Sequence, residues 1–580
     1  MSPQRKGIPT ASAGPRWRPH AHEKLVFLCV SLISFVVALD ATVIVPALPT
    51  LASALHCTSA QTFWIGTAYL LTYATFQPFI SALSDVFGRR SGLLSSVILF
   101  SMGTLFCSFA HAIEFMLVGR AVQGIGGGGI VSMTLIILTD IVPLRQRPRY
   151  IGYVQGAWAI GTISGPVIGG AVTEHSTWRW MFYINYPFCI IGLLMTPLLV
   201  RFNRPFLSTE QKWQRIDPIG SVLFTGGTIS FLMGITWGGI PGGFPWHSWR
   251  TILPITVGAA TIMIAIFWEI LYASDPIVRP KLFNSKSAVA TYLTTTIQGL
   301  LLYATIYYVS FYLQIVEDLS PLLNGVALIP AMGGLMPSSV LVGILVSKFG
   351  HLRWAIWGGW ALTTASTGLL MLLRVDTGAK VWCPILFGVG LGHGFLLTGH
   401  NVAVQALASP RDASYAAALY SFVRSVGICF GVALGGAVFQ NALIGYLGPA
   451  DLDLDIANDP RMLESVLAGI RTDPEKTDLV VSAFGAAYRD LFGVLTGVAG
   501  LGLLLSLVIG KMDMNKELSS EHTGESELRA FSSLGGEMPQ SGPGRSRSDN
   551  DSPKPDEVAR PDQARPAAHD ADEITVATKA

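Results

Sequence analysis

Long apolar segments dominate this sequence and decide what the chain can fold into. Fourteen of them reach about 20 residues, the length that an α-helix needs to cross the hydrocarbon core of a bilayer. They are 25–47, 62–83, 91–113, 115–141, 150–172, 181–200, 217–238, 252–273, 287–315, 323–347, 354–373, 382–406, 415–443 and 485–510. Of the 580 residues, 51% are hydrophobic and only 13% are charged, whereas an average soluble domain carries about 25% charged residues. We therefore predict an all-α membrane protein with fourteen transmembrane helices.

Basic residues in the short loops predict the orientation of these helices, because cytoplasmic loops carry an excess of lysine and arginine. The loops on the N-terminal side hold Arg89, Arg90, Arg145, Arg147, Arg149, Arg201, Arg204, Lys212, Arg215, Arg279, Lys281 and Lys286. The short loops opposite hold little beyond Arg179, Arg250, Arg374 and Lys380. An even number of spans places both termini on one side, which we predict to be the cytoplasm. The loop 444–484 then faces outward or into a lumen.

The spacing of glycines indicates an internal repeat. The pattern Gly161-x-x-x-Gly165 recurs as Gly427-x-x-x-Gly431, at an offset of 266 residues from Gly165 to Gly431. The same offset relates Gly124, Gly126 and Gly128 to Gly390, Gly392 and Gly394. Transporters are often built from such repeats, and six spans in each repeat leave two spans between them. The predicted parts are a disordered cytoplasmic N-terminus (1–21), a six-helix bundle (22–205), two inserted helices (206–280), a second six-helix bundle (281–510) and a disordered cytoplasmic tail (511–580).

The loop after the second span reads Ser81-Ala-Leu-Ser-Asp85-Val-Phe-Gly88-Arg89-Arg90. It resembles the signature loop of the major facilitator superfamily, Gly-x-Leu-x-Asp-x-x-Gly-Arg-Arg/Lys, with Ser81 in place of the first glycine. Asp85 is a short carboxylate at a helix end, where it can accept backbone N–H groups or pair with arginine. We predict a conformational latch made by Asp85, Gly88, Arg89 and Arg90. The alternative is that the two arginines only fix the topology by their charge.

Two further motifs occur in the expected spans. The fourth span carries Arg120-Ala-Val-Gln123-Gly124, which looks like a second signature of the same superfamily. The fifth span is similar to the pattern typical of its antiporters, with Gly161, Gly165, Pro166, Gly169 and Gly170. Pro166 removes a helix hydrogen bond and kinks the span, and the glycines allow close helix contact. Simple packing explains each glycine but not the set of motifs in this order.

Two segments at the ends of spans indicate a particular family within the superfamily. Leu39-Asp40-Ala-Thr42 ends the first span and Trp178-Arg179-Trp180 follows the fifth, and both resemble the fourteen-span drug:proton antiporter family, especially its fungal members. The resemblance covers about residues 24–510. It implies a secondary active transporter that exports small amphipathic organic compounds, such as toxic secondary metabolites or drugs, by proton antiport and alternating access. We expect a multi-pass plasma-membrane protein that functions as a monomer, with lipid, substrate and protons as its partners.

Other functions stay open at this point. Similar proteins move small charged solutes, such as basic amino acids or siderophores, across the vacuolar or plasma membrane, and a non-transporting membrane sensor is a more distant alternative. Gly124-Ile-Gly126-Gly-Gly-Gly129 fits the dinucleotide-binding fingerprint, but it follows no predicted strand and lies inside an apolar segment. The sequence has no Gly-x4-Gly-Lys-Ser/Thr loop and no cluster with metal-ligand spacing. We therefore expect no enzymatic activity, no cofactor, no metal and no nucleic-acid partner.

Three ionisable residues lie deep in predicted spans, where charges are costly and usually functional: Asp40, Arg120 and Arg424. At about 1.5 Å of rise per residue, Asp40 lies about 24 Å from the cytoplasmic face and Arg120 about 9 Å below the outer face. These depths add up to about the 30 Å thickness of the core, so both residues can lie at one level. We predict that Asp40 and Arg120 couple transport to protons; the alternative is a static pair that joins two spans. Arg424 either meets backbone carbonyls or lines the cavity.

The remaining candidates are polar or aromatic residues in the middle of spans. The candidates for cavity lining are Gln123, Gln298, Tyr303, Tyr307, His393 and Arg424. An aromatic wall suits bulky amphipathic substrates, although ordinary core packing explains the tyrosines equally well. Asp217 and Glu269 lie near span ends, and we expect both to reach the membrane interface. Asp140 lies close to the basic cluster Arg145–Arg149.

Overall fold

The computed structural model describes residues 19–201, 217–239, 244–273, 276–374, 377–447 and 474–514, and their regular structure is helical throughout. The segments predicted to be disordered, 1–21 and 511–580, lie almost entirely outside the described residues. The predicted loop 444–484 is only partly described, and its described ends are helical.

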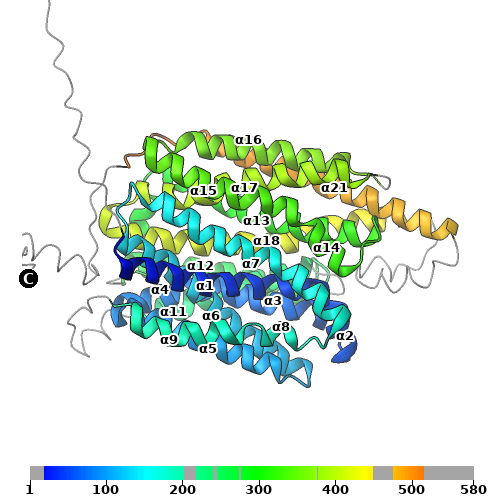
Figure 1. The fold of residues 1–580 in the computed structure, drawn as a ribbon, viewed down its shortest axis with the longest axis horizontal. Helices are drawn as coiled ribbons and strands as arrows, with labels where there is room; N and C mark the ends of the chain where they lie inside the picture. The colour runs from blue at the N-terminus through cyan, green and yellow to red at the C-terminus, as the bar shows by residue number, and fades with distance from the viewer. Residues whose placement is uncertain are drawn as a thin grey trace, which may run out of the picture. The chain divides into compact units, whose positions relative to one another are not determined.

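The helices follow one another along the chain, and within each continuously described stretch the connections between them are short (Figure 1). The first part forms α1 (Ala21–Val43), η1 (Val45–Ala47), α2 (Leu48–Ala54), α3 (Ser59–Thr75), α4 (Gln77–Phe87), α5 (Arg89–Ser108), α6 (Ile113–Ile141), α7 (Arg147–His175), α8 (Trp180–Tyr183) and α9 (Tyr186–Leu199). Then come α11 (Pro218–Gly239) and α12 (Trp249–Leu271). The last part forms η2 (Pro280–Phe283), α13 (Lys286–Ile315), α14 (Pro321–Ala327), α15 (Ile329–Phe349), α16 (Arg353–Leu369), η3 (Leu370–Leu372), α17 (Ala379–Leu407), η4 (Pro410–Asp412), α18 (Ala413–Leu447) and α21 (Pro474–Ser506).

Eleven helical segments among the described residues are long and apolar enough to cross a membrane. Helices also occupy the three other predicted spans, namely α3 with α4, α7, and α16. The second span is divided because α3 ends at Thr75 and α4 begins at Gln77, with Pro78 in its first turn. The prediction of an all-α membrane protein is thus confirmed, while the count of fourteen spans stays a prediction.

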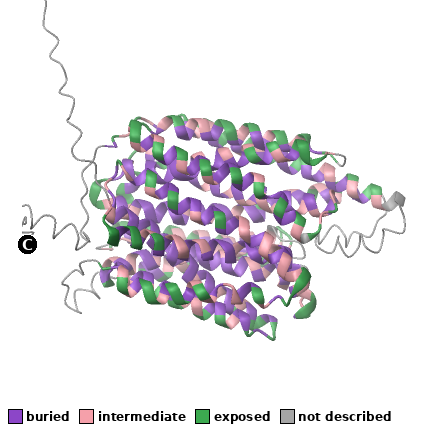
Figure 2. Cartoon of the chain, in the orientation of Figure 1, coloured by how far each residue is buried: buried purple, intermediate pink, exposed green. Residues whose placement is uncertain are grey.

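Apolar side chains cover the outside of the bundle as well as its inside. Figure 2 shows the exposed residues on the outward faces of the helices and the buried ones where helices meet. On α12, Met263 and Phe267 are 66% and 64% exposed. An outward apolar face of this kind is what a hydrocarbon environment requires. The protein is therefore a multi-pass membrane protein.

Helices of the first part pack mainly on one another, as do those of the last part. Helix α1 contacts α6, α7 and α9, and α6 also contacts α3 and α5. In the last part, α13 contacts α18, α15 and α16 both contact α17, and α21 contacts α13, α16 and α18. Helices α11 and α12 pack on each other, and α11 also contacts α3 and α18. The six, two and six grouping of spans stays a prediction.

Glycines of α6 hold it against its neighbours in the first part. A Cβ atom at Gly124 would collide with the carbonyl oxygen of Tyr69 in α3, and one at Gly128 with that of Tyr73. A Cβ at Gly126 would collide with the backbone of α5. Only glycine therefore allows α6 to lie between α3 and α5 at this distance.

The last part repeats these contacts. A Cβ at Gly390 in α17 would collide with the carbonyl oxygen of Ala331 in α15, and one at Gly394 with that of Leu335. A Cβ at Gly392 would press on the backbone of α16. The glycines that the sequence relates by one offset thus have equivalent neighbours in the two parts, as the predicted repeat requires.

The two parts meet along α7 and α15. A Cβ at Gly343 in α15 would collide with the carbonyl oxygen of Pro148, and one at Gly152 in α7 would lie 3.1 Å from the carbonyl oxygen of Ser339. Farther along α7, a Cβ at Gly325 of α14 would press on the backbone of Val167. Backbone thus lies directly on backbone along this contact.

Candidate functional site

Asp40 lies in the centre of the first part and is completely buried. Its Oδ2 atom accepts a hydrogen bond from Nη1 of Arg120 at 2.6 Å. Its Oδ1 atom accepts from Nε2 of Gln123 at 2.9 Å and from Nδ2 of Asn185 at 2.7 Å. The carboxylate therefore joins α1 to α6 and to the start of α9.

Arg120 is equally enclosed, with 1% of its side chain exposed. Its Nη1 also donates to Oε1 of Gln123 at 2.6 Å, and its Nε donates to the carbonyl of Ile65 at 3.1 Å. Its guanidinium lies 4.3 Å from the centre of the Tyr69 ring. The predicted pairing of Asp40 with Arg120 is present, and Gln123 belongs to this pair rather than to a pocket lining. Asn185 was not predicted as a partner of Asp40, although it belongs to the segment Trp178–Pro187 that carries the family resemblance.

The signature loop forms a second charged cluster at the end of the bundle that holds the N-terminus of α1, called the basic end below. Arg89 forms an ion pair with Asp85, and its Nε donates to Oδ2 of Asp140 at 2.8 Å. Oδ1 of Asp140 accepts from the hydroxyl of Ser414 at 2.5 Å. Since Ser414 lies in the first turn of α18, this cluster joins the loop to the last part of the chain.

Gly88 makes the turn on which this cluster depends. Its φ of 94° lies in a region that residues with a Cβ rarely adopt. The turn connects α4 to α5 and places Arg89, at the first position of α5, under the end of α6. Arg90 is only partly buried.

A second connection at the basic end was not predicted. Nη1 of Arg147 donates to Oε1 of Gln405 in α17 at 3.1 Å, and its Nε donates to the carbonyl of Val142 at 2.6 Å. The hydroxyl of Thr139 also donates to Oε1 of Gln405, at 3.4 Å. Arg147 therefore does more than set topology, because its buried side chain joins α7 to α17.

A pocket with about 730 Å³ of empty space, part of it open to solvent, lies toward the opposite end of the bundle. Its wall includes Thr42 in α1, Pro166 in α7, and Tyr303 and Tyr307 in α13. None of the described residues that line it is charged. Since Thr42 follows Asp40 by two positions, the pocket and the ion pair share α1.

The motif helix α7 forms one side of this pocket. A Cβ at Gly161 or Gly169 would collide with a backbone carbonyl of α1, and one at Gly165 would collide with the hydroxyl of Thr42. The Thr42 hydroxyl also donates to the carbonyl of Thr162 at 3.1 Å. The antiporter-type glycines thus hold α7 against the helix that carries Asp40.

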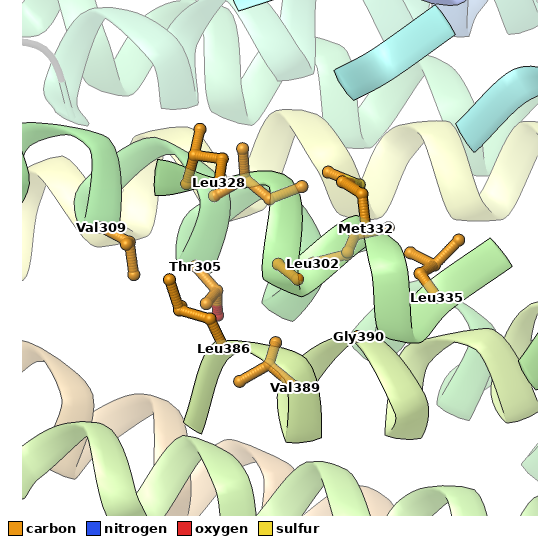
Figure 3. Close-up of a pocket in the computed structure, with 11 residues that line it drawn as sticks. Leu302, Thr305, Val309, Leu328, Met332, Leu335, Leu386, Val389 and Gly390 are labelled. Atoms are coloured by element: carbon orange, nitrogen blue, oxygen red, sulfur yellow. The ribbon is translucent and has the colours of Figure 1, made fainter. Parts of the chain in front are cut away.

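A smaller pocket, of about 290 Å³, lies inside the last part of the chain between α13, α15 and α17. Figure 3 shows leucine, valine and methionine side chains pointing into it, with the hydroxyl of Thr305 among them. Leu328 lines both pockets. The apolar wall of the smaller pocket offers contact area and few polar groups for recognition.

The remaining predicted residues lie outside the linings of these two pockets. Gln298 and His393 are completely buried, and Nε2 of Gln298 lies 3.5 Å from Nδ1 of His393. Arg424 is 5% exposed, with its guanidinium 4.7 Å from the centre of the Trp158 ring. Glu269 was expected at the membrane interface, but it is 4% exposed and accepts from the Val278 N–H at 3.2 Å.

Comparison with known proteins identifies the family. Residues 30–432 match the family described as Major Facilitator Superfamily. The chain belongs to the major facilitator superfamily. It is 38% identical to MFS transporter L2 of Phoma sp. (strain ATCC 20986 / MF5453) over 87% of this chain and 84% of that protein. It is 31% identical to MFS efflux transporter aclA of Aspergillus oryzae, over 88% of this chain and 93% of that protein.

Solved structures with the same fold are also major facilitator proteins. A bacterial homologue of the human lysosomal transporter Spinster, inward-facing and occupied, matches with a TM-score of 0.53 at 18% identity, over 85% of this chain and 97% of that one. A proton:xylose symporter matches with a TM-score of 0.52 at 13% identity, over 88% and 99% of the two chains. The expected major facilitator fold and superfamily are therefore confirmed, whereas the fourteen-span drug:proton antiporter family stays a prediction.

The connection between Asp140 and Ser414 gives a test of the latch in this major facilitator protein. We expect Asp140→Asn to increase hydrogen–deuterium exchange of residues 408–418 about tenfold, because a charged hydrogen bond contributes about 1.5–3 kcal/mol. Ser414→Ala removes only the bond to α18 and should give a similar increase. The control is Ser482→Ala, which removes a hydroxyl that bonds to the carbonyl of Leu479 within α21. Unchanged exchange in both test variants would show that the cluster does not hold the two parts together.

Proposed function

We propose that this chain exports small amphipathic organic compounds by proton antiport and alternating access. The observation that carries the proposal is the uncharged pocket beside the helix that holds Asp40. Relatives support the direction of transport, since a protein of Gibberella fujikuroi that is 32% identical is named efflux pump FUS6. Another relative, 30% identical, is named for the Acurin A biosynthesis cluster of Aspergillus aculeatus.

The composition of the pocket favours amphipathic compounds. Most of its lining is aliphatic or aromatic, and its polar groups are hydroxyls, including those of Thr67, Tyr303 and Ser310. Such a wall provides contact area for a bulky apolar body and a few hydrogen bonds for orientation. Its described lining provides no carboxylate for the cation of a basic amino acid.

The ion pair supplies a route for proton coupling. A guanidinium beside a buried carboxylate favours the ionised form, and separating the two favours the neutral form. If α1 and α6 shift relative to each other during the cycle so that the pair opens and closes, Asp40 takes up a proton in one state and releases it in the other. The membrane potential adds about 2.3 kcal/mol per charge per 100 mV.

The hydrogen bonds between the two parts fit one of the two states of an alternating-access cycle. The two parts are joined at the basic end by Asp140 with Ser414 and by Arg147 with Gln405. The pocket lies toward the opposite end. With both termini in the cytoplasm, as the basic loops predict, this is an outward-facing arrangement in the plasma membrane.

Transport by the purified protein in proteoliposomes tests the proposal. The probe is pyrenebutyramide, a neutral amphipathic compound whose passive distribution does not depend on pH. We expect an acidic lumen to accelerate its uptake relative to vesicles with equal pH on both sides. Protein-free vesicles should show no such acceleration. An uptake rate that is the same with and without the pH gradient would contradict proton-driven export.

A further inference from the structure

Arg424 is a buried cation with free hydrogen-bond donors. It lies three turns into α18 and is 5% exposed. Neither its Nε nor its Nη2 atom has a hydrogen-bond partner among the described residues. The ring of Trp158 faces its guanidinium at 4.7 Å, and such a contact holds the cation without occupying the N–H groups in its plane.

No acidic side chain is paired with Arg424 in the part of the chain that the structure describes. Among the described residues, the titratable groups that interact electrostatically with it include Tyr73, Tyr303, Tyr420 and His393. None of these is a carboxylate. A cation without a counter-ion is costly at this depth in a membrane protein, so its retention needs a reason.

Other polar atoms near Arg424 also lack partners. Nε2 of His393 and Oε1 of Gln298 have none among the described residues, although both side chains are completely buried. Gln298 precedes Gly299, where a Cβ would collide with the backbone carbonyl of Arg424. A polar site is therefore built where α13, α17 and α18 meet.

This site adjoins the large pocket. Tyr303 lines the pocket and interacts electrostatically with Arg424. Tyr303 also packs against the apolar cluster that contains Trp158, the residue beneath the guanidinium. A ligand whose apolar body fills the pocket can thus direct a polar group toward Arg424.

We propose that Arg424 binds an acidic group of the exported compound, a carboxylate or an equivalent pair of anionic oxygens. A guanidinium presents its Nε and Nη2 donors as a fork that matches two such oxygens. The ligand then supplies the counter-ion that the described residues do not. This inference rests on the proposed export function and narrows its substrates to amphipathic acids.

Binding of two matched probes to the full-length protein in nanodiscs tests the inference. Pyrenebutyrate carries the acid, and pyrenebutyramide has the same size without the charge. We expect the native protein to bind the acid about tenfold more tightly than the amide. Arg424→Gln should abolish this preference, and Arg424→Lys should keep part of it because the charge remains while the fork is lost.

Arg353→Gln is the matched control, because Arg353 also lies over a tryptophan, 4.3 Å from the centre of the Trp357 ring, at the start of α16. The control should keep the full preference for the acid. The assignment is overturned if the native protein binds both probes equally or binds neither, or if the preference survives in Arg424→Gln. Monodispersity of each variant by size-exclusion chromatography establishes that the variants are folded.

The outcome for Arg424 is separable from the outcome for export. If uptake of pyrenebutyramide follows the pH gradient but the acid has no advantage in binding, the assignment of Arg424 fails and proton-driven export stands. If the acid preference depends on Arg424 while neither probe follows the gradient, the binding site stands and export by proton antiport fails.

Discussion

Replacing Asp40 with asparagine is expected to remove the acceleration of transport by a pH gradient while substrate binding persists. Asparagine has nearly the same size, and its carbonyl oxygen can still accept from Gln123 and Asn185, which donate to Oδ1 of Asp40 in the native protein. It cannot take up a proton in the relevant range. Uptake of pyrenebutyramide should therefore proceed at one rate with and without an acidic lumen.

Glu269→Gln is the matched control for this prediction. Glu269 is also a buried carboxylate on a long apolar helix, but it accepts from the backbone of Val278 and lies on α12. The control should keep the native response to the gradient. If Asp40→Asn still accelerates with the gradient as the native protein does, the pair with Arg120 is a static connection between α1 and α6.

Arg120→Met is expected to destabilise the protein by roughly 3–5 kcal/mol, the cost of removing one member of a buried ion pair. The change leaves Asp40 buried without its cation and also removes the hydrogen bond to the carbonyl of Ile65. Neutralising the orphaned carboxylate in the double variant Asp40→Asn/Arg120→Met should recover part of this loss. Thermal unfolding of the purified variants measures both effects.

Arg179→Met is the matched control for stability. Arg179 also lies over an aromatic ring, 4.3 Å from the centre of Trp178, and donates to the carbonyl of Ala110 at 3.0 Å. It is only partly buried and has no ion pair among the described residues. A loss of stability in Arg120→Met no larger than that in Arg179→Met would show that the ion pair contributes little to the fold.

The contact of Asp40 with Arg120 could be predicted because depth in a membrane follows from a fixed rise per residue. Depth does not give rotation about the helix axis, so the hydrogen bonds from Gln123 and Asn185 to Asp40 could not be predicted in the same way. Which side chains complete a buried network depends on how helices are turned toward one another. The sequence encodes that rotation only weakly where almost every face is apolar.

The glycine contacts were predictable for a different reason. Where one helix backbone touches another, only glycine fits. The pattern that relates Gly124 to Gly390 can therefore be found in the sequence. Hydrogen bonds between the two parts have no such signature. Ser414 and Gln405 are ordinary residues in their local sequence, and only the fold places them against Asp140 and Arg147.

Glu269 shows where depth alone misleads. Its position near the end of α12 predicted a carboxylate at the membrane interface, but the chain after this helix returns and covers it with the N–H group of Val278. A charged residue near a helix end is exposed only if the connecting segment leaves it uncovered. The hydropathy of the sequence does not predict the conformation of that segment.

The contact of α7 with α15 determines how easily the two parts can move past each other. Where the side chains of two helices interdigitate, the helices resist sliding, because each side chain must first leave the groove that it fills. At the stretch where Gly152 lies against the backbone of Ser339 and Gly343 against that of Pro148, backbone contact takes the place of such interdigitation. We therefore expect this stretch to resist sliding little, so that the hydrogen bonds at the basic end supply most of the resistance there.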